Sequence, residues 1–170
     1  MKPLIVVSSR TGNTRLIARA LQDAVGECGY AEASAMPENL EVYNPIVLCF
    51  WCDRGLAPED IQAAAAKIRG RDLACFATLG GDPASEKARD WMHETCRWLA
   101  KLAQGSTVKL EFLCRGRIDP EVFDRMTAML GGEVSPEREA GRRAAETHPD
   151  RLDTMAAVKA YRDVFGCPQS

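Results

Sequence analysis

The chain has 170 residues, of which 46% are hydrophobic and 27% charged, a composition that is ordinary for one soluble globular domain. The formal net charge of −2 gives no general attraction to nucleic acid or to an anionic membrane, so neither is expected as a partner. The first apolar run, residues 4–7, is too short for a signal peptide or a membrane span, which predicts a cytoplasmic protein. Several of the seven cysteines lie inside apolar segments, which favours reduced, packed thiols.

Short apolar runs alternate with longer amphipathic ones along the chain. The pattern predicts strands at residues 4–7, 31–35, 45–51, 73–79 and 108–114. It predicts helices at residues 14–28, 58–68, 85–103, 119–130 and 150–165. Gly29 is expected to end the first helix. Residues 131–149 are rich in Gly, Pro and charge and are expected to form a long surface excursion, which makes 131–170 a C-terminal extension of a single domain, 1–170.

Five strands separated by helices predict an α/β fold, with one parallel five-stranded sheet and helices on both faces. In such sheets, ligands bind outside the carboxyl ends of the strands, near the point where the strand order reverses. Three segments of the chain are expected at that edge: residues 8–14, 50–57 and 78–85.

The first of these segments reads S-S-R-T-G-N-T and contains no acid. A helix N-terminus exposes unpaired N–H groups and a partial positive charge, and therefore attracts anions. In this segment, Gly12 allows close approach of the backbone to an anion. The side chains of Ser9, Thr11 and Thr14 offer hydroxyls, and that of Asn13 offers an amide. Each hydroxyl taken singly is equally well explained as a helix cap or a polar turn. The cluster as a whole predicts a phosphate-binding loop.

The type of phosphate follows from the spacing. Neither G-x-x-x-x-G-K-[ST] nor G-x-G-x-x-G is present, and the segment lacks the cysteine of a low-mass tyrosine phosphatase. The pattern S/T-x-T-G-x-T directly after the first strand, here Ser9-Arg10-Thr11-Gly12-Asn13-Thr14, resembles the FMN phosphate loop of flavodoxins. The resemblance covers about residues 3–130.

The resemblance implies a flavodoxin-like three-layer sandwich with strand order 2-1-3-4-5 and noncovalently bound FMN. In flavodoxins, the loops after the third and fourth strands embrace the flavin ring. The residues implied by that position are Trp51, Cys52, Asp53, Arg54 and Gly55, and Thr78, Leu79, Gly80, Gly81 and Asp82. Trp51 suits stacking on the isoalloxazine, although a core tryptophan at the end of a buried strand is an equal alternative. The loop after the fourth strand carries no aromatic residue.

Arg54 lies where flavodoxins usually surround the flavin with acids. Fully reduced FMN is an anion, so a nearby cation stabilises it. We therefore expect a hydroquinone couple that is less negative than in acidic flavodoxins.

Other reactive residues point to structural roles. Cys49 and Cys52 form a C-x-x-C, but Cys49 is expected to lie in a strand, which argues against a redox dithiol. His93 and His148 are expected to be structural or solvated, and no catalytic triad or metal site can be assembled from neighbouring sequence. Arg115 and Arg117 are expected in a solvated turn, with an acidic partner or a substrate carboxylate as the alternative.

Three functions are consistent with these observations. The first is an electron carrier that passes electrons from FMN to a larger redox enzyme through weak, transient docking with its reductase or terminal partner. The second is an FMN-dependent NAD(P)H reductase of quinones or other small acceptors. The third is a flavodoxin-like partner subunit that binds no flavin.

Overall fold

A computed structural model describes residues 1–166 of the chain. Its centre is one five-stranded sheet in the order β2-β1-β3-β4-β5, in which all neighbouring strands are parallel. The strands are β1 (Lys2–Val7), β2 (Gly29–Glu32), β3 (Tyr43–Trp51), β4 (Asp72–Leu79) and β5 (Thr107–Arg115). The predicted α/β fold and strand order are confirmed.

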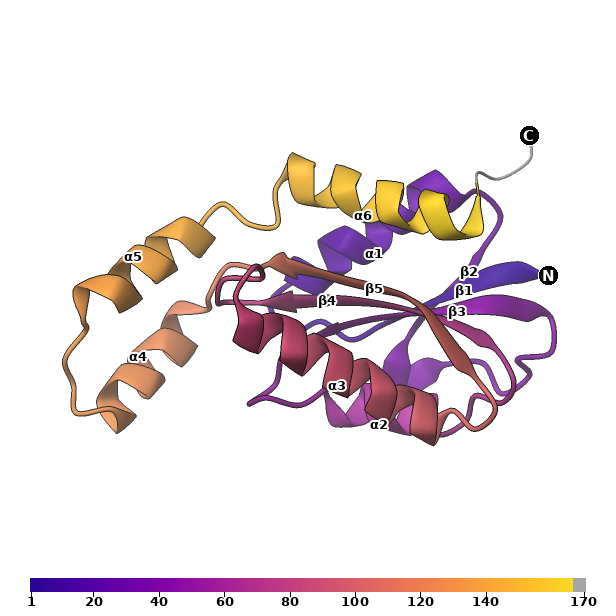
Figure 1. Cartoon of the computed structure of the whole chain (residues 1–170), viewed down its shortest axis with the longest axis horizontal. Helices are drawn as coiled ribbons and strands as arrows, with labels where there is room; N and C mark the ends of the chain where they lie inside the picture. Colours follow the sequence, from indigo (N-terminus) through magenta and orange to yellow (C-terminus); the bar gives the residue numbers. More distant parts are fainter. Residues whose placement is uncertain (167–170) are drawn as a thin grey trace.

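Helices cover both faces of the sheet (Figure 1). The helices are α1 (Asn13–Val25), α2 (Glu59–Ala65), α3 (Glu86–Leu102), α4 (Pro120–Met129), α5 (Pro136–Ala145) and α6 (Arg151–Phe165), with a short 3₁₀ helix at Ala33–Ala35. Helices α1 and α6 lie together on one face, and α2 and α3 lie on the other. Helices α4 and α5 project beyond the carboxyl ends of the strands, at the left of Figure 1. No helix in residues 1–166 is long and apolar enough to cross a membrane.

The apolar residues of the central strands alternate between two cores. On β1, Leu4 and Val6 face the core beneath α2 and α3, whereas Ile5 and Val7 face the core beneath α1 and α6. This two-residue alternation is the geometry of an extended strand. Because both faces of β1, β3 and β4 are buried, their sequences are continuously apolar, as expected for a parallel sheet.

The first helix is shorter than predicted. It ends at Val25, and Gly26, with a φ of 77°, is the residue that terminates it. Gly29 instead begins β2, where a Cβ atom would lie 2.7 Å from the side chains of Leu4 and Tyr43. The prediction that Gly29 ends the helix is therefore wrong, because close packing between strands requires this glycine. The second strand was predicted at residues 31–35. It lies at Gly29–Glu32, and Ala33–Ala35 form the 3₁₀ helix.

The surface segment expected at residues 131–149 contains a helix, α5, that the sequence did not predict. Ser135 accepts a hydrogen bond from the backbone N–H of Arg138 (3.3 Å) and caps α5, and Pro136 occupies the first turn. The guanidinium carbons of Arg138 and Arg142 lie 5.2 and 5.8 Å from the ring centroid of Phe123 in α4. Arg138 also donates to the Thr127 hydroxyl (3.3 Å), so arginine side chains of α5 contact both Phe123 and Thr127 of α4.

The core on the α2–α3 face contains Phe50, which is fully buried and meets Trp91 edge-on with ring centroids 6.3 Å apart. Truncation of Phe50 to Ala leaves a cavity, so we expect the free energy of unfolding to fall by about 3–5 kcal/mol in urea denaturation. Leu152→Ala in α6 is the control, because Leu152 is 72% exposed and should change stability by no more than about 0.5 kcal/mol. Equal destabilisation by the two variants would contradict this account of the core.

Candidate functional site

The segment S-S-R-T-G-N-T forms the turn from β1 into α1, as predicted. Gly12 immediately precedes α1 and has a φ of 97°, a left-handed conformation that L side chains rarely adopt. The hydroxyl oxygen of Ser9 accepts hydrogen bonds from the backbone N–H groups of Gly12 (3.2 Å) and Arg15 (3.3 Å). Ser9 therefore holds the loop in shape from within.

Three backbone N–H groups at the start of α1 have no partner among residues 1–166. They belong to Thr11, Asn13 and Thr14. No acid occurs between residues 8 and 22, so no side-chain carboxylate competes for these donors within this segment. Unpaired N–H groups at a helix N-terminus, in a segment with no negative charge, form an arrangement that binds an anion such as phosphate.

Two side chains of this loop form contacts that the sequence did not predict. The hydroxyls of Thr14 and Thr78 are hydrogen-bonded to each other at 2.9 Å, and both residues are buried. The amide of Asn13 donates to the carbonyl oxygen of Arg117 (2.8 Å). Thr14 therefore ties the loop to the end of β4, and Asn13 ties it to the segment that follows β5.

The second loop, residues 50–57, contains a tight turn from Asp53 to Leu56. Two backbone hydrogen bonds of 2.9 Å close it, and both central residues have positive φ, 51° at Arg54 and 83° at Gly55, as in a type I′ turn. The side chain of Arg54 is 94% exposed and lies 3.6 Å from the Asp53 carboxylate. The turn thus projects Arg54 into solvent at the carboxyl edge of the sheet.

Trp51 is the last residue of β3, at the start of the second loop, and is half-buried. The guanidinium carbon of Arg10 lies 5.9 Å from its ring centroid. Both residues line an open hollow of about 540 Å³, together with Ser8, Ser9, Asp53, Arg54, Pro58, Glu59 and Asp60. Trp51 is therefore a surface aromatic beside the first loop rather than a tryptophan sealed in the core.

The C-x-x-C pair does not have the geometry of a redox dithiol. Cys49 is fully buried in β3, and burial raises the pKa of its thiol far above the usual range. Burial also raises the pKa of Cys52, although a hydrogen bond from the Gly55 backbone opposes this. A reactive dithiol needs an exposed thiolate, and neither residue provides one at neutral pH.

The third loop, residues 78–85, is fixed to its neighbours on both sides. The backbone N–H of Cys52 donates to the Thr78 carbonyl (3.0 Å), and that of Gly116 donates to the Leu79 carbonyl (2.8 Å). A Cβ atom on Gly80 would lie 2.6 Å from the side chain of Ile118, so Gly80 is required by close contact. The exposed peptide from Gly80 to Asp82 is thereby held at the edge of the sheet.

Arg115 is not the solvated residue that the sequence suggested. Its Nε donates to the Gly81 carbonyl (3.1 Å), and its guanidinium lies 3.4 Å from the Asp82 carboxylate. Arg115 therefore fixes the third loop, which sequence reasoning missed because the contact joins two segments that are distant in the chain.

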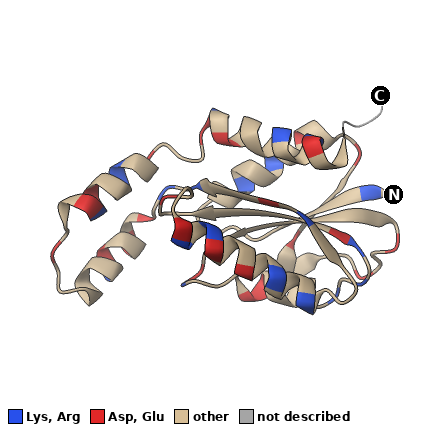
Figure 2. Cartoon of the chain, in the orientation of Figure 1, with Lys and Arg blue, Asp and Glu red and all other residues tan. Residues whose placement is uncertain are grey.

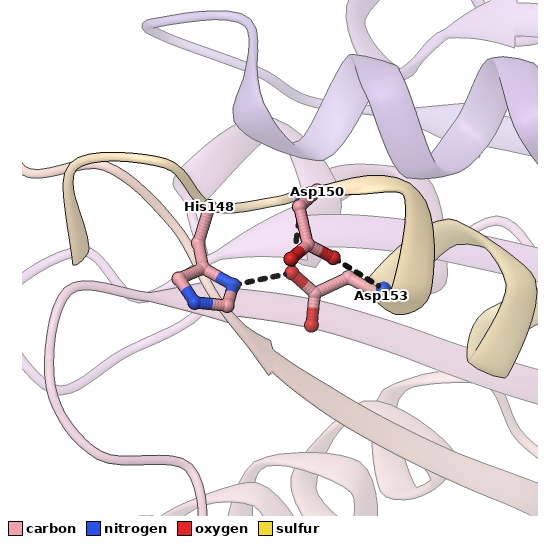
Figure 3. A group of neighbouring side chains, drawn as sticks. All are labelled: His148, Asp150 and Asp153. Atoms are coloured by element: carbon pink, nitrogen blue, oxygen red, sulfur yellow. Dashed lines mark hydrogen bonds and ion pairs between the residues drawn. The ribbon is translucent and has the colours of Figure 1, made fainter. Parts of the chain in front are cut away.

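The turn before α6 is held by hydrogen bonds among His148, Asp150 and Asp153, shown in Figure 3. Nδ1 of His148 lies 2.5 Å from the Asp153 carboxylate, and Asp150 caps α6 by accepting from the N–H groups of Leu152 and Asp153. The carbonyl of His148 accepts from the backbone N–H of Arg117 (2.7 Å). His148 therefore takes part in the hydrogen bonds of this turn. His93 is exposed on α3, 3.2 Å from Glu111.

The predicted residues therefore come together at one edge of the sheet. The first loop provides unpaired N–H donors, the second provides an aromatic ring and charged side chains, and the third provides exposed backbone. The sequence placed Arg115 and Arg117 in a turn at this edge, but it did not predict that Arg115 contacts the third loop or that the Arg117 carbonyl accepts from Asn13. The arrangement suits a flat ligand that carries a phosphate.

Comparison with known proteins gives the same fold. The chain is 25% identical to the flavodoxin-like domain-containing protein BilS of Clostridioides difficile over 167 residues, which cover 92% of each chain. Among solved structures, a flavodoxin from the domain Archaea superposes with a TM-score of 0.56 at 16% identity, covering 96% of each chain. General stress protein 14 of Treponema denticola, solved in complex with FMN, has a TM-score of 0.53 at 12% identity, with 94% of this chain and 99% of that chain covered.

The Flavodoxin domain family matches residues 4–162, which is nearly the whole chain. Together with the strand order and the loop after β1, this match shows that the chain belongs to the flavodoxin domain family.

Proposed function

We propose that this protein binds FMN and transfers electrons to a larger redox partner. The observation that carries the proposal is the first loop, where the N–H groups of Thr11, Asn13 and Thr14 lack partners in residues 1–166 and no acid lies nearby in the chain. A phosphate dianion satisfies such donors and is favoured by the partial positive charge of the helix start.

The other two loops are consistent with the flavin ring as the second part of the ligand. Trp51 offers a half-buried aromatic face, and the peptide from Gly80 to Asp82 offers backbone donors and acceptors that Arg115 and Ile118 hold in place. FMN, when bound, supplies one- and two-electron redox chemistry, and the protein binds and orients it. The relation to a structure solved with FMN supports this choice of ligand.

The partner is expected to dock transiently. In the view of Figure 2, α3, α5 and α6 each carry both basic and acidic residues. Small, weak interfaces are typical of electron-transfer encounters.

The first test is whether the purified protein is yellow and releases FMN on denaturation. We call the loop at residues 8–14, with its unpaired N–H groups, the cradle. Gly12→Ala should weaken FMN binding about tenfold, because a left-handed conformation costs an L residue roughly 1–2 kcal/mol and the backbone of the cradle must change shape to relieve it. Gly141→Ala is the matched control, since a Cβ at this residue of α5 meets nothing within 4 Å and should leave binding unchanged. If the wild-type protein does not bind added FMN, the electron-transfer proposal is wrong, and a partner subunit that binds no flavin is favoured.

Charge near the flavin provides a second test. Arg54→Glu replaces the exposed cation of the second loop by an anion, which should make the couple that forms anionic reduced FMN more negative. The effect should be reduced by the neighbouring Asp53 and by solvent, because Arg54 is 94% exposed. A redox titration at low ionic strength measures the shift. An unchanged potential would show that Arg54 does not act on the flavin.

A kinetic test separates the carrier from a reductase. We expect the isolated protein loaded with FMN to oxidise NAD(P)H with a quinone only slowly, because a carrier depends on partner enzymes for donor and acceptor. Steady-state absorbance measurements with and without quinone provide the rate. If the protein alone oxidises NAD(P)H rapidly, the proposal of an electron carrier is wrong, and an FMN-dependent oxidoreductase is favoured.

A further inference from the structure

We propose that Arg117 is a phosphate-binding residue, and that its guanidinium binds the anionic end of the ligand held by the first loop. This inference rests on the proposed function, since it concerns the same site. It assigns a direct electrostatic role to a residue outside the loop that carries the flavodoxin-like pattern.

The main chain of Arg117 is fixed beside the start of α1. Its carbonyl accepts from the side chain of Asn13 (2.8 Å), and its N–H donates to the carbonyl of His148 (2.7 Å). The preceding Gly116 is buried, and a Cβ atom there would lie 2.8 Å from Nδ2 of Asn13. Arg117 is therefore held against the residue that provides one of the unpaired N–H groups of the cradle.

The other arginines of this region are already engaged. Arg15 forms an ion pair with Glu32 (2.9 Å), Arg115 is bound to the third loop, and Arg10 lies over the ring of Trp51. Arg117 is exposed, and its guanidinium forms no hydrogen bond or ion pair with residues 1–166. It is thus a free cation on a rigidly placed backbone beside an anion cradle.

Three acids near this segment, one two residues along the chain and two that follow His148, form no ion pair with Arg117 within residues 1–166. Asp119 accepts from the N–H of Val122 and caps α4. Asp150 caps α6, and Asp153 is bonded to His148 and to the backbone N–H of Asp150. Each of these carboxylates has a local hydrogen-bond partner, and within residues 1–166 none pairs with the guanidinium of Arg117.

Backbone N–H groups and a guanidinium contribute different things to phosphate binding. The N–H groups are neutral donors that fix position, whereas arginine adds a full positive charge and charge-assisted hydrogen bonds. Arg117 should therefore increase affinity for FMN, which carries a phosphate, without affecting riboflavin, which carries none.

The test compares dissociation constants of FMN and riboflavin for the wild type and for Arg117→Gln. We expect Arg117→Gln to weaken FMN binding about tenfold, as for the loss of a charge-assisted hydrogen bond, and to leave riboflavin binding unchanged. Arg125→Gln, an exposed arginine of α4, is the matched control and should alter neither constant. The FMN constant of Arg117→Gln should also depend less on salt than that of the wild type.

The outcomes distinguish this inference from the proposed function. If the wild type binds FMN and Arg117→Gln binds it equally well with the same salt dependence, the role of Arg117 is overturned while FMN binding stands. If Arg117→Gln weakens FMN and riboflavin binding equally, with an unchanged melting temperature, the role is overturned as well, because Arg117 would then act on the flavin ring or the ribityl chain, which both ligands share. A wild type that binds neither flavin overturns both proposals.

Discussion

Burial of both faces of β1, β3 and β4 is the constraint on which the rest of this structure depends. Strands that contact helices on both sides offer no exposed polar face within the sheet. Polar chemistry is therefore confined to the loops at the ends of the strands, and in a parallel sheet all carboxyl ends lie at one edge. The hydroxyls, amides and arginines of the first, second and third loops meet there for this reason.

Hydrogen bonds between these loops fix their positions relative to one another. The buried pair Thr14–Thr78 joins the start of α1 to the end of β4, and the N–H of Cys52 joins the second loop to the same residue. Two hydroxyls buried together satisfy each other and avoid the cost of unpaired polar groups. Thr78 thus connects all three loops, so the cradle and the flanking backbone are positioned as one unit.

The segment after β5 runs along the carboxyl edge of the sheet, beside the site. Before α6 packs beside α1, the chain forms α4 and α5, which project from the carboxyl edge (Figure 1). The connection passes directly beside the site, with Arg115 on the third loop and Arg117 beside Asn13. Exposed apolar residues such as Met126, Met129 and Leu130 occupy α4 and the turn after it.

The sequence by itself determined the α/β class, most of the strands and the position of the loop after β1, because each depends on residues that are neighbours in the chain. Apolar periodicity and the spacing in S-R-T-G-N-T are local signals. Only the tertiary structure decided that Arg115 fixes a loop while the Arg117 guanidinium pairs with no group in residues 1–166, and that the Thr14 hydroxyl bonds that of Thr78. Those contacts join residues that are far apart, 104 positions in the case of Asn13 and Arg117, and such pairings follow from strand order and register rather than from local pattern.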